Sequence, residues 1–269
     1  MMGAGIFAPF IQQIGNHRAT LCVPPHHPCF SDHQVRSLPV LPGVSYLELV
    51  LNTATMLFPH FRANTLEDCL WLRPFLGNVA SPRLNIEFTP AGNQRLTFTV
   101  ADQDHTYALG CLCSETAVTQ VPAQGQRIRE QLVLNSSRHF DHQQVYAEFS
   151  GMGIDYGPFF KKISHVCIHE QQSLALLSRQ AGAGFCFSNL LDCAFQSGMA
   201  ISIGIERGSL MPFSLGTLVL HAPIDFSHTN EYWVTTQKHT EFRTDICVLS
   251  HDGRPLISVR DLGVKPSLL

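Results

Sequence analysis

One histidine in this sequence stands where an imidazole could act as a base. His33 precedes a turn at Pro42-Gly43, and the apolar run after the turn indicates a helix buried on most sides. Near pH 7 a neutral imidazole can accept a proton. The first N–H groups of a helix are unpaired and lie at the positive end of its dipole. The stretch therefore predicts a base beside free N–H donors; a half-buried histidine that only bonds a nearby carbonyl is the alternative interpretation.

An acid and an amide form a second group. Asp192 and Gln196 are four residues apart, so they share one face of the helix that we expect from about Ser188 to Ile205. Burial of a carboxylate is costly unless the group is paired or protonated. Either Asp192 is a functional acid, or it satisfies a backbone group in the first turn of the helix. The helix alone favours neither interpretation.

The elements that would position these residues fall into two halves of similar order. In the first half, Ser45 and Glu48 have the spacing of a capping box at a helix start, and Pro59 ends this helix near Phe58. Alternating and apolar segments predict strands at 19–23, 66–72, 83–88, 95–100 and 106–113. In the second half we expect helices at 142–149 and from 188, and strands at 162–169, 173–178, 217–221, 232–236, 242–249 and 255–259.

Residues 116–126 separate the two halves. This segment is small and polar and contains Pro122 and Gly125, which is typical of a linker. Each half has one main helix and several antiparallel strands, and a sheet of that kind can wrap around a helix. The element order therefore favours an α+β fold with two tandem units, at residues 1–120 and 121–269.

Composition argues against several classes of function. The chain has 269 residues, of which 45% are hydrophobic and 14% charged, with a formal net charge of −3. These values are typical of a globular protein. No basic cluster could neutralise phosphates, so nucleic acid is not an expected partner. No apolar run reaches membrane-spanning length, and the N-terminus lacks the cationic start of a signal peptide.

The cysteines and histidines do not predict a metal site. Nine cysteines occur without a C-x-x-C pair, which favours reduced packing cysteines in a cytoplasmic protein. His26, His27 and Cys29 cluster, but no second ligand pair accompanies them.

The two chemical groups also carry a resemblance. His33 and Pro42 match the H-x-x-x-G-x-x-x-x-P signature of the dehydratase domains of modular type I polyketide synthases, with Ser37 in place of the glycine. Asp192 and Gln196 match the D-x-x-x-Q/H signature of the same domains. The segment with His33 and the segment with Asp192 thus both resemble the same family, although they are far apart in the sequence.

Two further segments are similar to the same domains. The stretch from Gly153 to Phe160 matches G-x-x-Y-G-P-x-F at every fixed position. Residues 211–214 (MPFS) are similar to an L-P-F-S segment, with methionine for leucine, and Leu220-His221 follows as in the family. The four signatures come in the family's order between residues 27 and 221, which is most of the chain.

The resemblance implies a fold and a reaction. The fold is an α+β double hotdog, in which an antiparallel sheet wraps a central helix in each of two tandem units that together form one dehydratase domain. The reaction is loss of water from a β-hydroxyacyl thioester on acyl carrier protein, which gives the α,β-unsaturated enoyl thioester. It needs a base for the α proton, an acid for the departing hydroxyl and donors for the carbonyl oxygen.

The family's roles then fall on residues of this chain. His33 would be the base, and Asp192 the acid, kept protonated by apolar neighbours. Gln196 and Tyr156 would orient the carboxyl group. Gly157 and Pro158 would support the turn. The N–H groups of Gly43 and Val44, beside Pro42, would bind the thioester.

Partners and rival functions follow from the same resemblance. It implies no metal or redox cofactor, only the phosphopantetheine of an acyl carrier protein, and neighbouring synthase domains as partners, with a homodimer as a further option. Double-bond-shifting isomerases, pyran-forming variants and catalytically silent dehydratase-like scaffolds stay open as alternatives. If position 37 needs a positive φ, Ser37 would strain the strand that bears His33.

Overall fold

The computed structural model describes residues 5–78, 82–92, 94–114, 136–179, 184–203, 210–227 and 229–266. The described helices are η1 (Ala8–Phe10), α1 (Pro28–Ser31), α2 (Gly43–Leu57), α4 (His142–Gly151), α5 (Phe187–Met199) and η2 (Ala200–Ser202). The strands up to residue 113 are β1 (Ile11–Gln13), β2 (Arg18–Cys22), β3 (His33–Val35), β4 (Leu38–Pro39), β5 (Thr65–Trp71), β6 (Arg83–Pro90), β7 (Arg95–Ala101) and β8 (Thr106–Cys113). The later strands are β9 (Arg138–Asp141), β10 (Ile154–Tyr156), β11 (Ile163–His169), β12 (Gln172–Ser178), β13 (Leu210–Leu220), β14 (Glu231–Thr240), β15 (Arg243–Leu249) and β16 (Pro255–Pro266).

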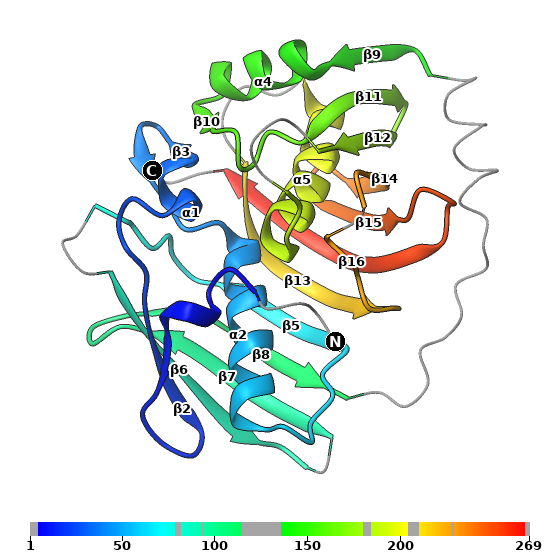
Figure 1. The fold of residues 1–269 in the computed structure, drawn as a ribbon. Coiled ribbons are helices and arrows are strands. Elements are labelled where there is room, and N and C mark those ends of the chain that lie inside the picture. Colours follow the sequence, from blue (N-terminus) through cyan, green and yellow to red (C-terminus); the bar gives the residue numbers. More distant parts are fainter. Residues whose placement is uncertain are drawn as a thin grey trace.

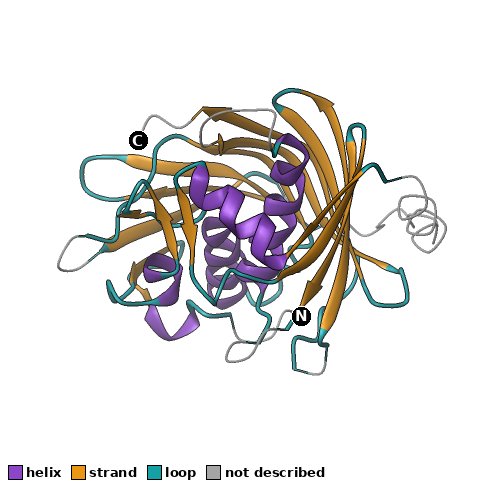
Figure 2. Cartoon of the chain, turned by 90° about the horizontal axis from the view of Figure 1, so that it is seen from above, coloured by secondary structure: helices purple, strands orange, loops and turns teal. Residues whose placement is uncertain are grey.

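A single antiparallel sheet joins the two halves of the chain. Its thirteen strands run in the order β1-β2-β6-β7-β8-β5-β13-β16-β15-β14-β12-β11-β9. The halves meet where β5 pairs with β13, with Leu215 opposite Cys69. Figure 1 shows α2 and α5 next to this sheet, and Figure 2 shows the helices enclosed by curved strands. The predicted α+β arrangement of antiparallel strands around a helix in each half is confirmed.

The predicted strands are largely confirmed in position. The segments expected at 83–88, 95–100 and 106–113 are β6, β7 and β8, and the alternation of buried and half-exposed residues along β7 matches its sequence pattern. The last strands extend beyond their predicted ends, since β13 begins at Leu210 and β16 continues to Pro266. The linker at 116–126 and the boundary at 120/121 lie outside the described residues.

The start of α2 corrects the capping-box prediction. The helix begins at Gly43 after Pro42, so Ser45 lies inside its first turn, and the buried Ser45 hydroxyl has no hydrogen-bond partner among the described residues. Glu48 turns away from its own helix start: its carboxylate accepts bonds from the N–H of Ile6 (2.8 Å) and the N–H of Ser188 (2.9 Å). The prediction was wrong because the unpaired N–H groups at the start of α5 attract the carboxylate more strongly.

The second central helix also differs from its predicted bounds. α5 begins at Phe187 with a capping box of Cys186 and Asn189, and it ends at Met199, earlier than the expected end near Ile205. Asp192 therefore lies in the second turn and accepts no backbone bond at the helix start. The interpretation of Asp192 as a first-turn cap was wrong.

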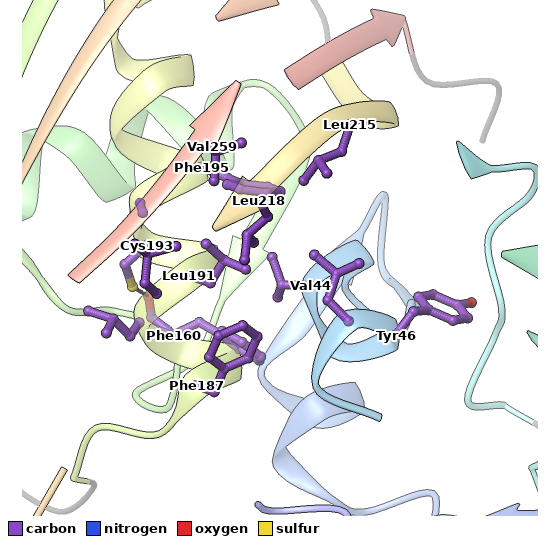
Figure 3. Packing of buried hydrophobic residues seen from close by; sticks show 14 of the residues in the cluster. Val44, Tyr46, Phe160, Phe187, Leu191, Cys193, Phe195, Leu215, Leu218 and Val259 are labelled. Carbon is purple, nitrogen blue, oxygen red and sulfur yellow. Dashed lines mark hydrogen bonds between the residues drawn. The ribbon is translucent and has the colours of Figure 1, made fainter. Parts of the chain in front are cut away.

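One hydrophobic core spans both halves. Figure 3 shows side chains of α2, α5, β13 and β16 packed in one cluster. Val44 of α2, Leu191 and Cys193 of α5, and Leu218 of β13 are fully buried there. Burial of apolar area drives this packing, and it holds the two helices at fixed positions relative to each other. No helix among the described residues is long and apolar enough to cross a membrane.

Candidate active site

A small second sheet places His33. β3 pairs with β4 on one side and with β10 on the other, in antiparallel fashion, and Tyr156 lies opposite His33 in the β3–β10 pair. The Arg36 N–H also donates to the carbonyl of Gly153 at 2.7 Å. Because β10 follows α4 in the second half of the chain, this sheet fixes a first-half residue against a second-half segment.

The turn between β3 and β4 requires positive φ angles. Ser37 has φ +65° and Arg36 has φ +49°, in the left-handed region that glycine enters freely. Ser37 occupies the position where the resembled signature has glycine. The conditional prediction of strain at this position is therefore confirmed in its geometry: a serine is held in a backbone conformation that costs energy for any residue with a Cβ.

The imidazole of His33 has one tautomer that fits its surroundings. Its Nδ1 lies 2.8 Å from the carbonyl oxygen of Val40, which can only accept, so Nδ1 carries the proton and Nε2 keeps its lone pair. Burial lowers the pKa of His33, while the nearby Asp192 and the Val40 carbonyl act in the opposite direction. The rings of Tyr156 and Phe160 lie edge-on at 5.5 and 5.7 Å. The result is a neutral, oriented imidazole whose Nε2 has no hydrogen-bond partner among the described residues.

Asp192 is a buried carboxyl group that accepts a hydrogen bond from one side chain among the described residues. It is 6% exposed, and its Oδ2 accepts a bond of 2.8 Å from Nε2 of Gln196. Burial raises the pKa of Asp192, and the attraction of His33 and the Gln196 bond offset only part of this effect. The environment thus favours the protonated carboxyl group, which could donate a proton to a bound molecule.

Sequence reasoning missed a tyrosine behind the acid. The hydroxyl of Tyr146, on α4, lies 3.0 Å from Oε1 of Gln196. It also accepts a bond of 3.1 Å from the N–H of Ile163. Tyr156, which was expected to orient Asp192, has no hydrogen bond to it; its ring packs on His33 and lies near the carboxyl group. No local signal identifies Tyr146, because it is an ordinary buried aromatic of an amphipathic helix.

His33, Asp192, Tyr156 and Gly43 line one cavity of about 350 Å³. Its walls are mainly apolar and include Trp71 and residues from α5 and the start of β13, among them Met199, Met211 and Pro212. Two cations, Arg73 and Lys265, also border it, and both are exposed. A deep polar pair, apolar walls and a cationic mouth suit a long, mostly apolar ligand with an anionic end.

The start of α2 brings N–H donors to this cavity. The indole Nε1 of Trp71 donates to the Gly43 carbonyl at 2.9 Å, and a Cβ on Gly43 would lie 3.2 Å from the Trp71 ring. No described residue accepts a bond from the N–H of Gly43 or Val44. Pro42 is the N-cap, and neither Pro42 nor the buried Val44 side chain lines the cavity.

Gly157 and Pro158 support the site from outside the cavity. The N–H of Gly157 donates to the Asp32 carbonyl at 2.8 Å, and a Cβ on Gly157 would lie 2.3 Å from Cγ of Asp32. The Asp32 carboxylate also accepts a bond from the N–H of Phe159 at 2.8 Å. Pro158 is exposed. This turn requires glycine for close packing, and it ties the residue next to His33 to the second half of the chain.

Within the described part of the chain, one group has ligand atoms close enough for a metal ion, and it does not border the cavity. It comprises Asp102, Asp104 and His105, on the loop between β7 and β8. All nine cysteines are described, and none forms a disulfide. The cluster of His26, His27 and Cys29 does not reach metal-ligand geometry.

Comparisons with known proteins show the family of the chain. A family model described as "Polyketide synthase dehydratase N-terminal domain" matches residues 126–267, and one described as "Polyketide synthase dehydratase domain" matches residues 14–103. The first match alone covers more than half of the chain. The chain therefore belongs to the polyketide synthase dehydratase family.

Two curated relatives place the chain within much longer proteins. It is 29% identical to the polyketide synthase PksN of Bacillus subtilis over 261 residues, which cover 89% of this chain and 5% of that protein. It is 25% identical to the polyketide synthase ThaG of Burkholderia thailandensis over 259 residues, which cover 92% of this chain and 4% of that protein. The chain thus spans about a twentieth of the length of these relatives.

Solved structures share the fold. A dehydratase domain of a trans-AT polyketide synthase from Brevibacillus brevis superimposes with a TM-score of 0.83 at 18% identity, covering 98% of this chain and all of that one. The dehydratase domain of RzxB from Pseudomonas fluorescens gives 0.71 at 20% identity, covering 93% of this chain and 94% of that one. The fold is the double hotdog of these domains, as the sequence predicted.

Proposed function

We propose that this chain removes water from a β-hydroxyacyl thioester carried by an acyl carrier protein and forms the α,β-unsaturated enoyl thioester. The observation that carries the proposal is the shared cavity: a neutral imidazole with a free Nε2 and a buried carboxyl group with a raised pKa line the same apolar space. These are the base and the acid that dehydration needs, and they come from different halves of the chain.

The proposed chemistry follows from the two side chains. Nε2 of His33 removes the proton α to the thioester carbonyl, and the electron pair of that C–H bond forms the double bond. The β-carbon–oxygen bond breaks as Asp192 gives its proton to the departing hydroxyl, which leaves as water. The N–H groups of Gly43 and Val44, at the positive end of α2, hold the carbonyl oxygen as negative charge develops on it.

The cycle closes by return of one proton. After water leaves, His33 is protonated and Asp192 is ionised, and attraction between them stabilises this pair in the buried site. Transfer of the proton from the imidazolium to the carboxylate, directly or through a water molecule, restores the starting state. No step needs a metal or a redox cofactor, and the substrate's own phosphopantetheine arm supplies the thioester.

The partners and location are part of the same proposal. An acyl carrier protein would deliver the substrate. Because the curated relatives are polyketide synthases about twenty times longer than the matched segment, neighbouring synthase domains are further expected partners. We also propose a cytoplasmic location, supported by nine cysteines without a disulfide, and leave self-association as a property to be measured.

The test is turnover of a β-hydroxyacyl pantetheine thioester, followed as loss of the mass of one water. His33→Ala and Asp192→Asn should each lower kcat by roughly 10² to 10⁴, the range for a lost acid or base. His105→Ala and Asp104→Asn are matched controls, since both residues are exposed and neither lines the cavity, and they should turn over like the parent.

Other outcomes would identify the rival functions. A moved double bond in an enoyl thioester, without loss of water from the hydroxyacyl thioester, would indicate an isomerase. A cyclised product from a substrate with a second hydroxyl would indicate a pyran-forming enzyme. A folded protein without turnover of any carrier-bound substrate would indicate a scaffold. Dehydration that survives both substitutions would contradict the assigned roles.

A further inference from the structure

The amide of Gln196 can adopt only one orientation. Its Nε2 lies 2.8 Å from Oδ2 of Asp192 and 3.1 Å from the carbonyl oxygen of Phe160. The Phe160 carbonyl has no proton to give, so the NH₂ group, rather than the amide oxygen, must face it. The amide oxygen then points at the Tyr146 hydroxyl, 3.0 Å away.

The Tyr146 hydroxyl donates its proton to Oε1 of Gln196, because the other acceptor within reach is already paired. The oxygen of Tyr146 receives the N–H of Ile163, and its own proton can go to Gln196 Oε1 or to the Phe160 carbonyl at 3.2 Å. The Phe160 carbonyl already receives Nε2 of Gln196 and the Cys193 thiol, at 3.1 and 3.0 Å. Oε1 of Gln196 has Tyr146 as its donor and would otherwise be buried without a bond, which is costly.

Orientation of the amide determines which oxygen of Asp192 is free. Nε2 of Gln196 donates to Oδ2, so Oδ2 acts as an acceptor. Among the described residues Oδ1 has no hydrogen-bond partner, and Asp192 borders the cavity. The acid's proton is therefore favoured on Oδ1, where a bound hydroxyl can receive it. A flipped amide would present Oε1 to the carboxyl group and draw the proton onto Oδ2, away from the substrate.

We propose that Tyr146 is a positioning residue for the dehydration: through its bond to Gln196 it keeps the proton of Asp192 on the oxygen that faces the substrate. The proposal rests on the dehydratase function argued above. Tyr146 does not line the cavity, and it acts from behind the acid through one side chain. Its place is fixed by burial and by packing against the rings of His142 and Phe149.

The test is Tyr146→Phe, which removes the hydroxyl and keeps the ring. We expect kcat for dehydration to fall roughly tenfold to a hundredfold with KM nearly unchanged, because the lost effect belongs to proton transfer and not to binding. Tyr232→Phe is the matched control: the residue is also buried, its hydroxyl donates to a backbone carbonyl, and it does not border the cavity.

The pH profile separates a positioning role of Tyr146 from a merely structural one. A loosened or flipped Gln196 stabilises the carboxylate less, or accepts from the protonated acid, and both changes raise the pKa of Asp192. The alkaline limb of the kcat profile should thus move to higher pH in Tyr146→Phe. A merely structural loss would admit water and move the same limb to lower pH, which would overturn the proposal. His33, Tyr156 and Cys193 also face this carboxyl group, so their protonation states enter the fit.

A double-mutant cycle completes the test. In a Gln196→Ala background, Tyr146→Phe should change kcat by less than about twofold, because the hydroxyl has nothing left to orient. Full additivity of the two substitutions would refute the route through Gln196. If the parent protein does not dehydrate any thioester, the function has failed; if the parent turns over and Tyr146→Phe behaves like Tyr232→Phe, only the positioning proposal has failed.

Discussion

His33 and Tyr156 lie directly opposite each other on the paired strands β3 and β10, although they come from different halves of the chain. Their rings meet edge-on with centroids 5.5 Å apart. The pairing explains how a residue before α2 reaches a cavity that α5 closes from the other side. The geometry of the candidate site therefore depends on a three-stranded sheet as well as on the two central helices.

The rate of dehydration should have a bell-shaped dependence on pH. Burial lowers the pKa of His33 from 6.5 and raises that of Asp192 from 3.8. The base is active when neutral, so kcat/KM falls when the pH drops through the pKa of His33, at a value below 6.5. The acid is active when protonated, so kcat/KM falls again when the pH rises through the pKa of Asp192, at a value above 3.8. A kcat/KM that still rises well above pH 6.5 would contradict the lowered pKa of His33. An alkaline limb that stays in place in Asp192→Asn would contradict Asp192 as the acid.

Ser37→Gly should stabilise the protein without loss of activity. The left-handed backbone at φ +65° costs a serine roughly 1–2 kcal/mol. Glycine is more flexible than serine in the unfolded chain, and this offsets about 0.4–1 kcal/mol of the gain in stability. Since Ser37 is exposed, no packing is lost, and we expect a net gain of roughly 0.5–1 kcal/mol in the free energy of unfolding in urea.

The control for this gain is Ala147→Gly. Ala147 is an exposed residue inside α4, where glycine should cost about 1 kcal/mol. If Ser37→Gly also destabilises the protein, the turn is not strained. If it stabilises the protein but changes KM or product geometry, the strain itself contributes to the shape of the site.

Glu48→Ala should be severely destabilising. The side chain is 1% exposed and bonds the N–H of Ile6, the N–H of Ser188 and the Ser188 hydroxyl at 2.8, 2.9 and 2.5 Å. Removal leaves buried donors unpaired together with a cavity, at a cost of about 3–5 kcal/mol. Glu148→Ala, on the exposed side of α4, should stay within about 0.5 kcal/mol of the parent.

A second variant covers the case in which Glu48→Ala does not fold. Glu48→Gln keeps the volume but turns an NH₂ group toward some of the donors, so it should lie between the parent and Glu48→Ala in urea midpoint. Equal stability of Glu48→Gln and the parent would show that the bridge between α2 and α5 contributes little.

Gly43→Ala should slow the reaction, and a smaller partner should restore part of the rate. The new Cβ would meet the Trp71 ring at 3.2 Å, so the ring or the start of α2 must shift by a few tenths of an ångström. A shift of the N–H donors lowers kcat, roughly tenfold. Trp71→Phe makes room for the methyl group, so the double variant should exceed Gly43→Ala in kcat. An equal loss of kcat in Gly43→Ala and in the double variant would show that the contact with the Trp71 ring does not cause the defect.

Much of the fold could be predicted because its signals are local. The alternation of Leu96, Phe98 and Val100 identifies β7, and Pro59 ends α2 one residue after its C-cap at Phe58. The motif residues His33, Asp192, Tyr156 and Gly43 do meet at one cavity. Each strand or helix boundary could be predicted from nearby residues. The site residues are far apart in the sequence, and they could be grouped because they lie in or next to the family signatures.

What the sequence did not predict concerns contacts between distant segments. β3 and β10 are each too short to show alternation, and they exist because they pair with each other. Glu48 has the spacing of a helix cap, yet it bonds Ser188 from the other half of the chain. Tyr146 supports Gln196 from α4, and its sequence context gives no sign of a polar role. Tertiary structure overrides local pattern at all three places.

Glu48 and Asp192 are each the sixth residue of their helices, and the Glu48 side chain is longer by one methylene. The two helix starts differ in which of their N–H groups are paired. Glu48 reaches the start of the opposite helix, where the N–H of Ser188 is occupied by its carboxylate and that of Asn189 by the Cys186 sulfur. The start of α2 has no such internal acceptor among the described residues. Under the proposed function, the start of α2 is therefore the helix end that offers two adjacent N–H groups without an acceptor among the described residues. A tight-binding thioester analogue should then saturate the protein at a stoichiometry of one per chain.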